Sequence, residues 1–189
     1  MPGASGEFDL ILALNQDNMT TIEIAGEKDA AMLSELAAKT FTESHGHSAP
    51  QADISHYINE QYNVDLLRQE LKKPENIYHI LYYNDEAAGY SKILMNAPYE
   101  GSPFNNIAKL ERIYLLKKYY NLNLGKALFE FNIMLMKTQH QSGAWLYVWK
   151  DNQRAIGFYR KQGFVITGSY DFNISATHSN PNHRLLLVF

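Results

Sequence analysis

The chain has 189 residues, of which 46% are hydrophobic and 20% are charged, the composition of an ordinary folded globular protein. A net charge of −3 argues against nucleic acid or an anionic membrane surface as the main partner. Cysteine is absent, which excludes disulfides, thiol-based catalysis and cysteine-ligated zinc.

The first segment, residues 1–18, is expected to be an N-terminal extension. Its apolar stretch, residues 8–14, is too short to span a bilayer, and no basic segment precedes it. We therefore expect neither a signal peptide nor a membrane anchor, and a cytoplasmic location. Residues 19–189 are predicted to form a single domain.

Strand-like runs and apolar helical stripes alternate along the rest of the chain. Strands are predicted at residues 20–25, 77–83, 87–95, 108–116, 144–149, 164–172 and 184–189. Helices are predicted at residues 28–41, 54–71, 124–141 and 152–162. The strand–helix–strand unit at 108–149 lies between hairpins. This order predicts a mixed α/β fold, with a mostly antiparallel sheet of about seven strands flanked by about four helices.

Residues 110–128 predict a strand that runs through a short loop into a helix, with Gly125 and Lys126 at the helix start. Amides at a helix start lack intrahelical partners, and the helix dipole adds positive potential, so this turn suits a pyrophosphate. A Walker A loop is excluded because Tyr120 and Ala127 stand where Gly and Ser or Thr are required. A dinucleotide-binding fingerprint is excluded because its further glycines are absent.

The same segment resembles the acetyl-coenzyme A loop of GCN5-related N-acetyltransferases, Gln/Arg-x-x-Gly-x-Gly/Ala, when it is aligned on Gly125. Two positions depart from that pattern. Asn123 replaces the first glycine, a mild change because asparagine tolerates a positive φ. Tyr120 replaces the first residue and removes a polar contact that is usual in the family.

A second segment, residues 145–164, matches a later motif of that family, Asn-x-x-Ala-x-x-Phe-Tyr-x-Lys/Arg-x-Gly-Phe. The matching residues are Asn152, Ala155, Phe158, Tyr159, Lys161, Gly163 and Phe164. Asn152 is also a good helix N-cap, and it shares a helical face with Tyr159, seven residues later. The two segments and the order of the strands identify the chain as a member of the GNAT family.

The resemblance implies an enzyme with the GNAT fold that moves an acetyl group from acetyl-coenzyme A to a primary amine by direct attack on the thioester. It implies cofactor contacts at Ile113, Tyr114, Leu115, Tyr120, Asn121, Asn123, Leu124, Gly125, Lys126, Asn152 and Tyr159, and no metal. Segments 41–44, 88–93, 110–114 and 145–149 resemble bacterial spermine/spermidine acetyltransferases of the PaiA type, so polyamines are the favoured acceptors. Family members often pair as dimers, which suggests a homodimer.

Two residues are predicted to be catalytic. An amine with a pKa near 10.4 must lose a proton to react, which costs about 4.6 kcal/mol at pH 7. Glu111 is the candidate base, directly or through water; the alternative is a structural carboxylate paired with Arg112. Tyr159 is the general acid that the resemblance implies, and its alternative role is packing against the cofactor. A backbone amide between Ile113 and Leu115 is expected to polarise the thioester carbonyl.

Other polar residues are given simpler roles. His45 and His47 fall in a predicted loop at 44–51 and are expected to be solvated rather than to form a metal site or a proton relay. Glu43 is a candidate for attracting a cationic amine. Trp145 and Trp149 share one face of a strand and are expected to pack in the core beside the cofactor.

Two further functions remain open. The first is acetylation of a protein or peptide at its N-terminus or a lysine, which requires an open groove. The second is a non-catalytic acetyl-coenzyme A-binding module. The departures at Tyr120 and Asn123 favour a binding module, whereas the matches at Asn152 and Tyr159 count against it.

Overall fold

The computed structural model describes residues 19–189, and the predicted extension at 1–18 lies outside them. The strands are β1 (Thr20–Ile24), β2 (Asn76–Tyr83), β3 (Glu86–Leu94), β4 (Ala108–Leu115), β5 (Gly143–Trp149), β6 (Val165–Asn173) and β7 (Ser179–Val188). The helices are α1 (Ala30–His45), α2 (Gln51–Gln61), α3 (Val64–Leu71), α4 (Leu124–Thr138) and α5 (Gln153–Lys161).

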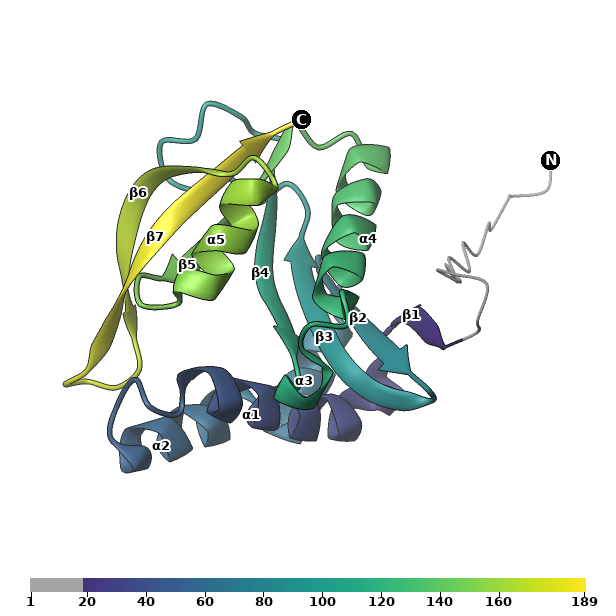
Figure 1. Ribbon diagram of the computed structural model, residues 1–189, viewed down its shortest axis with the longest axis vertical. Coiled ribbons are helices and arrows are strands. Elements are labelled where there is room, and N and C mark those ends of the chain that lie inside the picture. The colour runs from purple at the N-terminus through teal and green to yellow at the C-terminus, as the bar shows by residue number, and fades with distance from the viewer. Residues whose placement is uncertain (1–18) are drawn as a thin grey trace.

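The strands form one seven-stranded sheet in the order β1-β2-β3-β4-β5-β7-β6 (Figure 1). Every neighbouring pair is antiparallel except β4 and β5, which are parallel. The prediction of a mixed, mostly antiparallel sheet is therefore confirmed. Asn84 and Asp85 form the tight turn between β2 and β3, with φ values of 50° and 63° that match the turns favoured in two-residue hairpins.

Helices cover both faces of the sheet. On one face, His79 of β2 and Ser91 of β3 lie 3.0 and 3.2 Å from the side-chain oxygen of Asn132 in α4. On the other, the hydroxyl of Tyr78, the neighbour of His79, donates to Glu70 of α3. Because successive side chains of a strand point to opposite faces, α4 and α3 lie on opposite sides. Figure 1 shows α4 and α5 in front of the sheet, with α1, α2 and α3 across its lower end.

The two parallel strands in the middle of the sheet separate after a short contact. β4 and β5 pair only at Ala108 with Ala144 and at Lys109 with Trp145, and they diverge beyond those pairs (Figure 1). The amide of Leu116 donates to the carbonyl of Ala88 in β3, at 2.9 Å. Because successive amides of a strand point to opposite edges, the amide of Leu115 points to the edge that β5 has left open.

The second predicted helix was wrong in one respect. Residues 54–71 form parts of two helices, because the side chain of Asn63 accepts a hydrogen bond from the amide of Leu66, at 2.8 Å, and caps a new helix there. Residues 19–189 therefore form five α-helices rather than about four. Apolar residues continue at helical spacing across this break, so the pattern alone did not reveal it.

The last strand begins five residues earlier than the predicted residue 184, at Ser179. Pro181 obscured this start because proline is rare inside sheets. Its carbonyl accepts a hydrogen bond from Lys150, at 2.9 Å, just beyond the end of β5 at Trp149. The nitrogen of Pro181 faces the same edge of β7. Because β5 has ended there, no strand requires a hydrogen bond from the amide of residue 181, and proline is accommodated.

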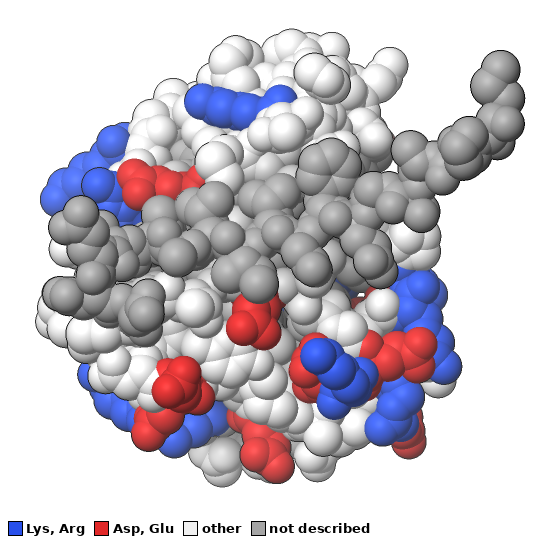
Figure 2. Space-filling view, turned by 90° about the vertical axis from the view of Figure 1, so that its right-hand side faces the viewer, with Lys and Arg blue, Asp and Glu red and all other residues white. Residues whose placement is uncertain are grey.

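Figure 2 shows one face of the molecule, where the Lys and Arg side chains of the described residues lie interspersed with Asp and Glu. On that face neither sign gathers into one large patch. Among residues 19–189, no helix combines the length and the apolar character needed to cross a membrane.

Candidate active site

Two cavities meet beside the open edge of β4. The first, here called the groove, has a volume of about 450 Å³ and lies between β4, the start of α4 and α5. The second, the aromatic pocket, has about 340 Å³ and lies between β4, the ends of β5 and β7, α1 and α2. Both are lined by Ile113, Tyr114, Asn152, Ala155 and Tyr159. These shared residues mark the junction of the two cavities.

All eleven residues predicted to contact the cofactor line the groove. Asn123 precedes α4 with φ of 60°, the left-handed conformation expected at that position. The first main-chain bond of α4 runs from the amide of Ala127 to the carbonyl of Asn123, at 3.0 Å. The amides of residues 124–126 precede that bond and lack an intrahelical acceptor, so they can bind an anion. A Cβ on Gly125 would meet only the side chain of Leu115, at 3.5 Å, so its backbone is open to the groove.

Arg154 of α5 lies against the residue that departs from the family pattern. Its guanidinium carbon is 4.1 Å from the centre of the Tyr120 ring, and its Nη2 donates to the side-chain oxygen of Asn121 at 3.2 Å. Arg154 and Lys161 line the groove but were not predicted as cofactor residues. The only sequence signal for Arg154 was its position two residues after Asn152. Tyr120 lacks the polar group that is usual at its position in the family, and the structure places the guanidinium of Arg154, from α5, beside it.

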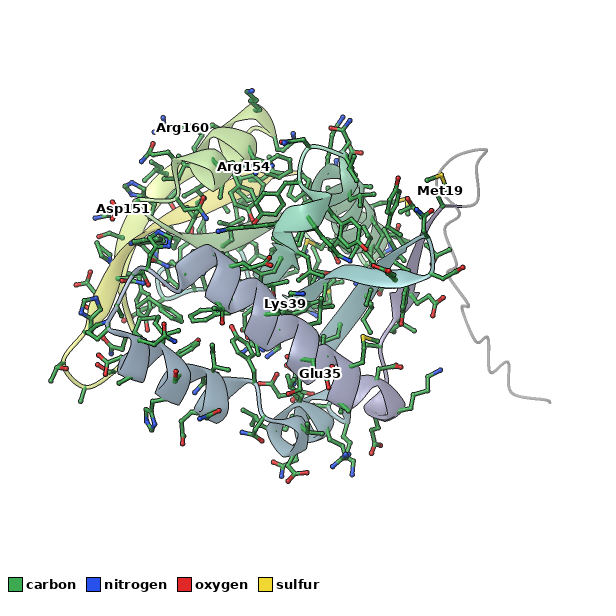
Figure 3. All side chains as sticks on the ribbon, turned by 60° about the horizontal axis from the view of Figure 1, so that its bottom comes forward. Met19, Glu35, Lys39, Asp151, Arg154 and Arg160 are labelled. Carbon is green, nitrogen blue, oxygen red and sulfur yellow. The ribbon has the colours of Figure 1, made fainter. Side chains whose placement is uncertain are left out.

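We expect Arg154→Ala to weaken coenzyme A binding about tenfold, which corresponds to about 1.4 kcal/mol, because a guanidinium near the phosphates is lost. The matched control is Arg160→Ala, which removes a second exposed arginine of α5 that does not line the groove (Figure 3). Titration calorimetry with coenzyme A and with acetyl-pantetheine, which has no phosphates, measures the effect. Equal weakening of both ligands would show that Arg154 does not act through the phosphates.

The aromatic pocket combines rings with a few polar groups. Its aromatic side chains are Phe41, His45, Tyr57, Tyr62, Tyr114, Tyr147, Trp149, Tyr159 and Phe172. Asn182 of β7 also lines it, and the side-chain oxygen of this residue is buried without a hydrogen-bond partner among the described residues. Buried polar atoms in folded proteins are nearly always paired. The oxygen of Asn182 is therefore suited to accept a hydrogen bond from a molecule bound in the pocket.

Glu111 lines the aromatic pocket but is held by two lysines. Its carboxylate lies 2.8 Å from Nζ of Lys92 and 3.3 Å from Nζ of Lys109. Burial alone would raise the pKa of Glu111, but the charges of Lys92 and Lys109 outweigh it and lower the pKa to about 2. Such a carboxylate is ionised at neutral pH and is a weak proton acceptor. These contacts favour the alternative of a paired structural carboxylate, with lysines rather than Arg112 as the close partners.

Tyr159 stands at the junction of the two cavities. Its side chain packs against Phe129 and Phe164, and only 7% of the residue is exposed. Burial raises the pKa of the Tyr159 hydroxyl, which therefore stays protonated at neutral pH and can donate. Asn152 begins the same helix, where its side-chain oxygen accepts from the amide of Ala155 at 3.1 Å and acts as the N-cap.

The expected solvated loop at 44–51 was wrong for His45. α1 continues through His45, and its ring is stacked on Phe41 with 4.9 Å between ring centres. His47 is exposed, as expected. Glu43 does not line the aromatic pocket; it accepts a hydrogen bond from the amide of Lys117 at 2.7 Å.

The two tryptophans of β5 have different surroundings. Trp149 lines the aromatic pocket. Trp145 packs in a small cluster with Ile107 and Leu186, away from the groove. The expectation that both fill the core beside the cofactor therefore does not hold for Trp145.

Comparison with known proteins gives consistent results. A model of the acetyltransferase (GNAT) family matches residues 31–164. An uncharacterized N-acetyltransferase of Lactobacillus delbrueckii subsp. lactis is 31% identical over 149 residues, covering 78% of this chain and 86% of that protein. The spermidine N(1)-acetyltransferase of Thermoplasma acidophilum is 26% identical over 151 residues, covering 77% of this chain and 89% of that protein.

Among solved structures, the PaiA N-acetyltransferase from Thermoplasma acidophilum, crystallised in complex with coenzyme A, has a similar fold. Its TM-score is 0.73 at 20% identity, covering 90% of this chain and 99% of that one. At this identity the likeness speaks for the fold alone.

Proposed function

Because the chain belongs to the acetyltransferase (GNAT) family, we propose that it transfers the acetyl group of acetyl-coenzyme A to a small primary amine bound in the aromatic pocket. One observation carries this proposal: the groove and the aromatic pocket meet beside the open edge of β4, at Tyr159. A thioester at that junction can be approached from the pocket by an amine. Direct transfer then needs no covalent enzyme intermediate.

The residues at the junction divide the work. The first amides of α4 hold the phosphates, and the amide of Leu115, at the open edge of β4, is aimed where the thioester carbonyl would lie. Tyr159 gives its proton to the departing thiolate. Acetyl-coenzyme A supplies the activated acetyl group.

Polyamines are the acceptors that the sequence resemblance favours, and a spermidine acetyltransferase is among the relatives. The rings of Tyr57, Tyr62 and Trp149 can contact an ammonium group and its alkyl chain. Glu111 adds a carboxylate, but Lys92 and Lys109 balance its charge. Arg112 adds a further cation, whose guanidinium carbon lies 5.1 Å from the centre of the Tyr62 ring. The aromatic rings, rather than a net negative charge, would therefore hold an ammonium group with an apolar chain, and the remaining amines of a polyamine would extend toward solvent.

The test is release of coenzyme A from acetyl-coenzyme A, followed with a thiol reagent, in the presence of spermidine, spermine, simple alkylamines and peptides. Saturable turnover with spermidine or spermine, and none with peptides, is the expected result. Turnover with peptides alone would replace this proposal by protein acetylation. Tight binding of acetyl-coenzyme A with no turnover on any amine would indicate a binding module.

A further inference from the structure

His45 occupies a constrained position at the edge of the aromatic pocket. It is the last residue of α1, and its ring centre lies 5.8 Å from that of Trp149 and 5.9 Å from that of Tyr114. Tyr114 is one of the residues at the junction of the two cavities. The stack on Phe41 fixes the plane of the imidazole. A rigid ring therefore faces the pocket close to where the thioester is expected.

The hydrogen bonds around Ser44 assign the tautomer of this ring. The Ser44 hydroxyl oxygen lies 2.8 Å from the carbonyl oxygen of Thr40 and 2.8 Å from Nδ1 of His45. A hydroxyl has one proton and a carbonyl can only accept, so Ser44 donates to Thr40 and accepts from Nδ1. Nε2 of the neutral ring then carries the free lone pair. No residue within 19–189 forms a hydrogen bond with Nε2.

The surroundings of His45 contrast with those of Glu111. Burial, and secondly the nearby His47, lower the pKa of His45 to about 4, so the ring is neutral at pH 7. Neither a lysine nor an arginine forms an ion pair or hydrogen bond with it in the described chain. The same burial lowers the pKa of an ammonium group brought into the pocket, which narrows the pKa difference between that ammonium group and the imidazole of His45. Of the two groups, the imidazole is the one that no cation of the described residues holds in an ion pair.

We propose that His45, rather than Glu111, takes the proton from the acceptor ammonium group, an assignment that rests on the proposed function. An N–H bond of the ammonium breaks, its electron pair stays on nitrogen, and the proton moves to Nε2. That pair then forms the C–N bond to the thioester carbonyl carbon. The C–S bond breaks with its pair on sulfur, which takes the proton of the Tyr159 hydroxyl. The nitrogen, now bonded to the acetyl carbon, still carries a second proton, and it gives that proton to the Tyr159 phenolate as the amide forms. The imidazolium loses its proton to solvent, so one proton is released per turnover.

The variant His45→Gln tests this step, because glutamine keeps a polar side chain but cannot take up a proton near neutral pH. We expect kcat/KM for an alkylamine acceptor to fall about a hundredfold. Acetyl-coenzyme A affinity should stay the same. The matched control is His56→Gln, since His56 of α2 is exposed and lines neither cavity, and its activity should match that of the wild type.

A second acceptor separates proton transfer from positioning. An arylamine, whose conjugate acid has a low pKa, arrives already neutral at pH 7. His45→Gln should therefore reduce turnover of the arylamine much less than turnover of the alkylamine. An equal loss with both amines would overturn the proposal in favour of a structural role.

Rescue supplies an independent measurement. In His45→Ala, added imidazole should restore alkylamine turnover while leaving the unfolding temperature unchanged. Absence of rescue in a folded variant counts against proton transfer, and so does wild-type activity in His45→Gln. Wild-type protein that turns over no amine would instead contradict the proposed function itself.

Discussion

Replacing Tyr159 by phenylalanine is expected to lower kcat by about a hundredfold to ten-thousandfold, because general acid catalysis contributes on that scale. Tyr159 lines both the groove and the aromatic pocket, and burial keeps its hydroxyl protonated. Removing it leaves the thiolate to depart without a proton. The phenylalanine ring preserves the packing against Phe129 and Phe164, so the fold should be intact.

Steady-state kinetics and calorimetry together measure this effect. Acetyl-coenzyme A should bind Tyr159→Phe with nearly wild-type affinity, so the loss appears in kcat. Tyr170→Phe makes the same chemical change at an exposed site on β6 and should leave kcat unaffected. Turnover near wild type in Tyr159→Phe would mean that water supplies the proton and that Tyr159 only packs.

Replacing Lys92 by methionine is expected to destabilise the fold by about 2–3 kcal/mol, because it removes the cation that contacts two half-buried carboxylates. The change leaves Glu111 with Lys109 and Glu70 with Arg112. The Lys92 side chain is 5% exposed and lies 3.2 Å from Glu70 and 2.8 Å from Glu111. A carboxyl whose pKa falls from 4.5 to about 2 on folding gains about 3 kcal/mol of stability at neutral pH. The free energy expected from the lost contacts and the free energy expected from the pKa shift therefore agree in size.

The pH dependence gives a second measure of the same cluster. The folded-state pKa of Glu111 is below its ordinary value, so its contribution is full above pH 4.5 and is lost as the pH falls toward 2. Urea unfolding of Lys92→Met should show a weaker loss of stability over that acid range than the wild type.

Lys118→Met is the matched control for Lys92→Met. Lys118 pairs with Glu86 at 2.6 Å, but both side chains are largely exposed, and exposed pairs contribute little. Its removal should change the free energy of unfolding far less. If the two variants were equally stable, the buried cluster would not hold the fold in the way described.

The backbone geometry of the segment expected to hold the cofactor could be predicted from sequence because it is local. The left-handed turn at Asn123, the free amides at the start of α4 and the cap at Asn152 each depend on residues a few positions apart. The positions of most strands along the chain could be predicted for a similar reason, since they depend on apolar alternation and on turns such as Asn84–Asp85.

The acceptor side of the site depends on contacts between distant segments. The pKa of Glu111 is set by Lys92 of β3, which Glu70 of α3 also contacts. His45 is half-buried because Trp149 and Tyr114, which follow it by more than sixty residues in the chain, lie against it. No local sequence pattern indicates such neighbours. The sequence therefore predicted Glu111 as a candidate base and His45 as a residue of a solvated loop.

The separation of β4 from β5 makes the sheet mechanically two half-sheets joined by two residue pairs. α4 ties them together, since Leu128 packs in the cluster of the N-terminal half and Met136 in that of the C-terminal half. A cofactor bound along the open edge of β4 would lie between the two half-sheets and fix their separation. The walls of the aromatic pocket come from both half-sheets, so the width of the pocket would depend on whether the cofactor is bound.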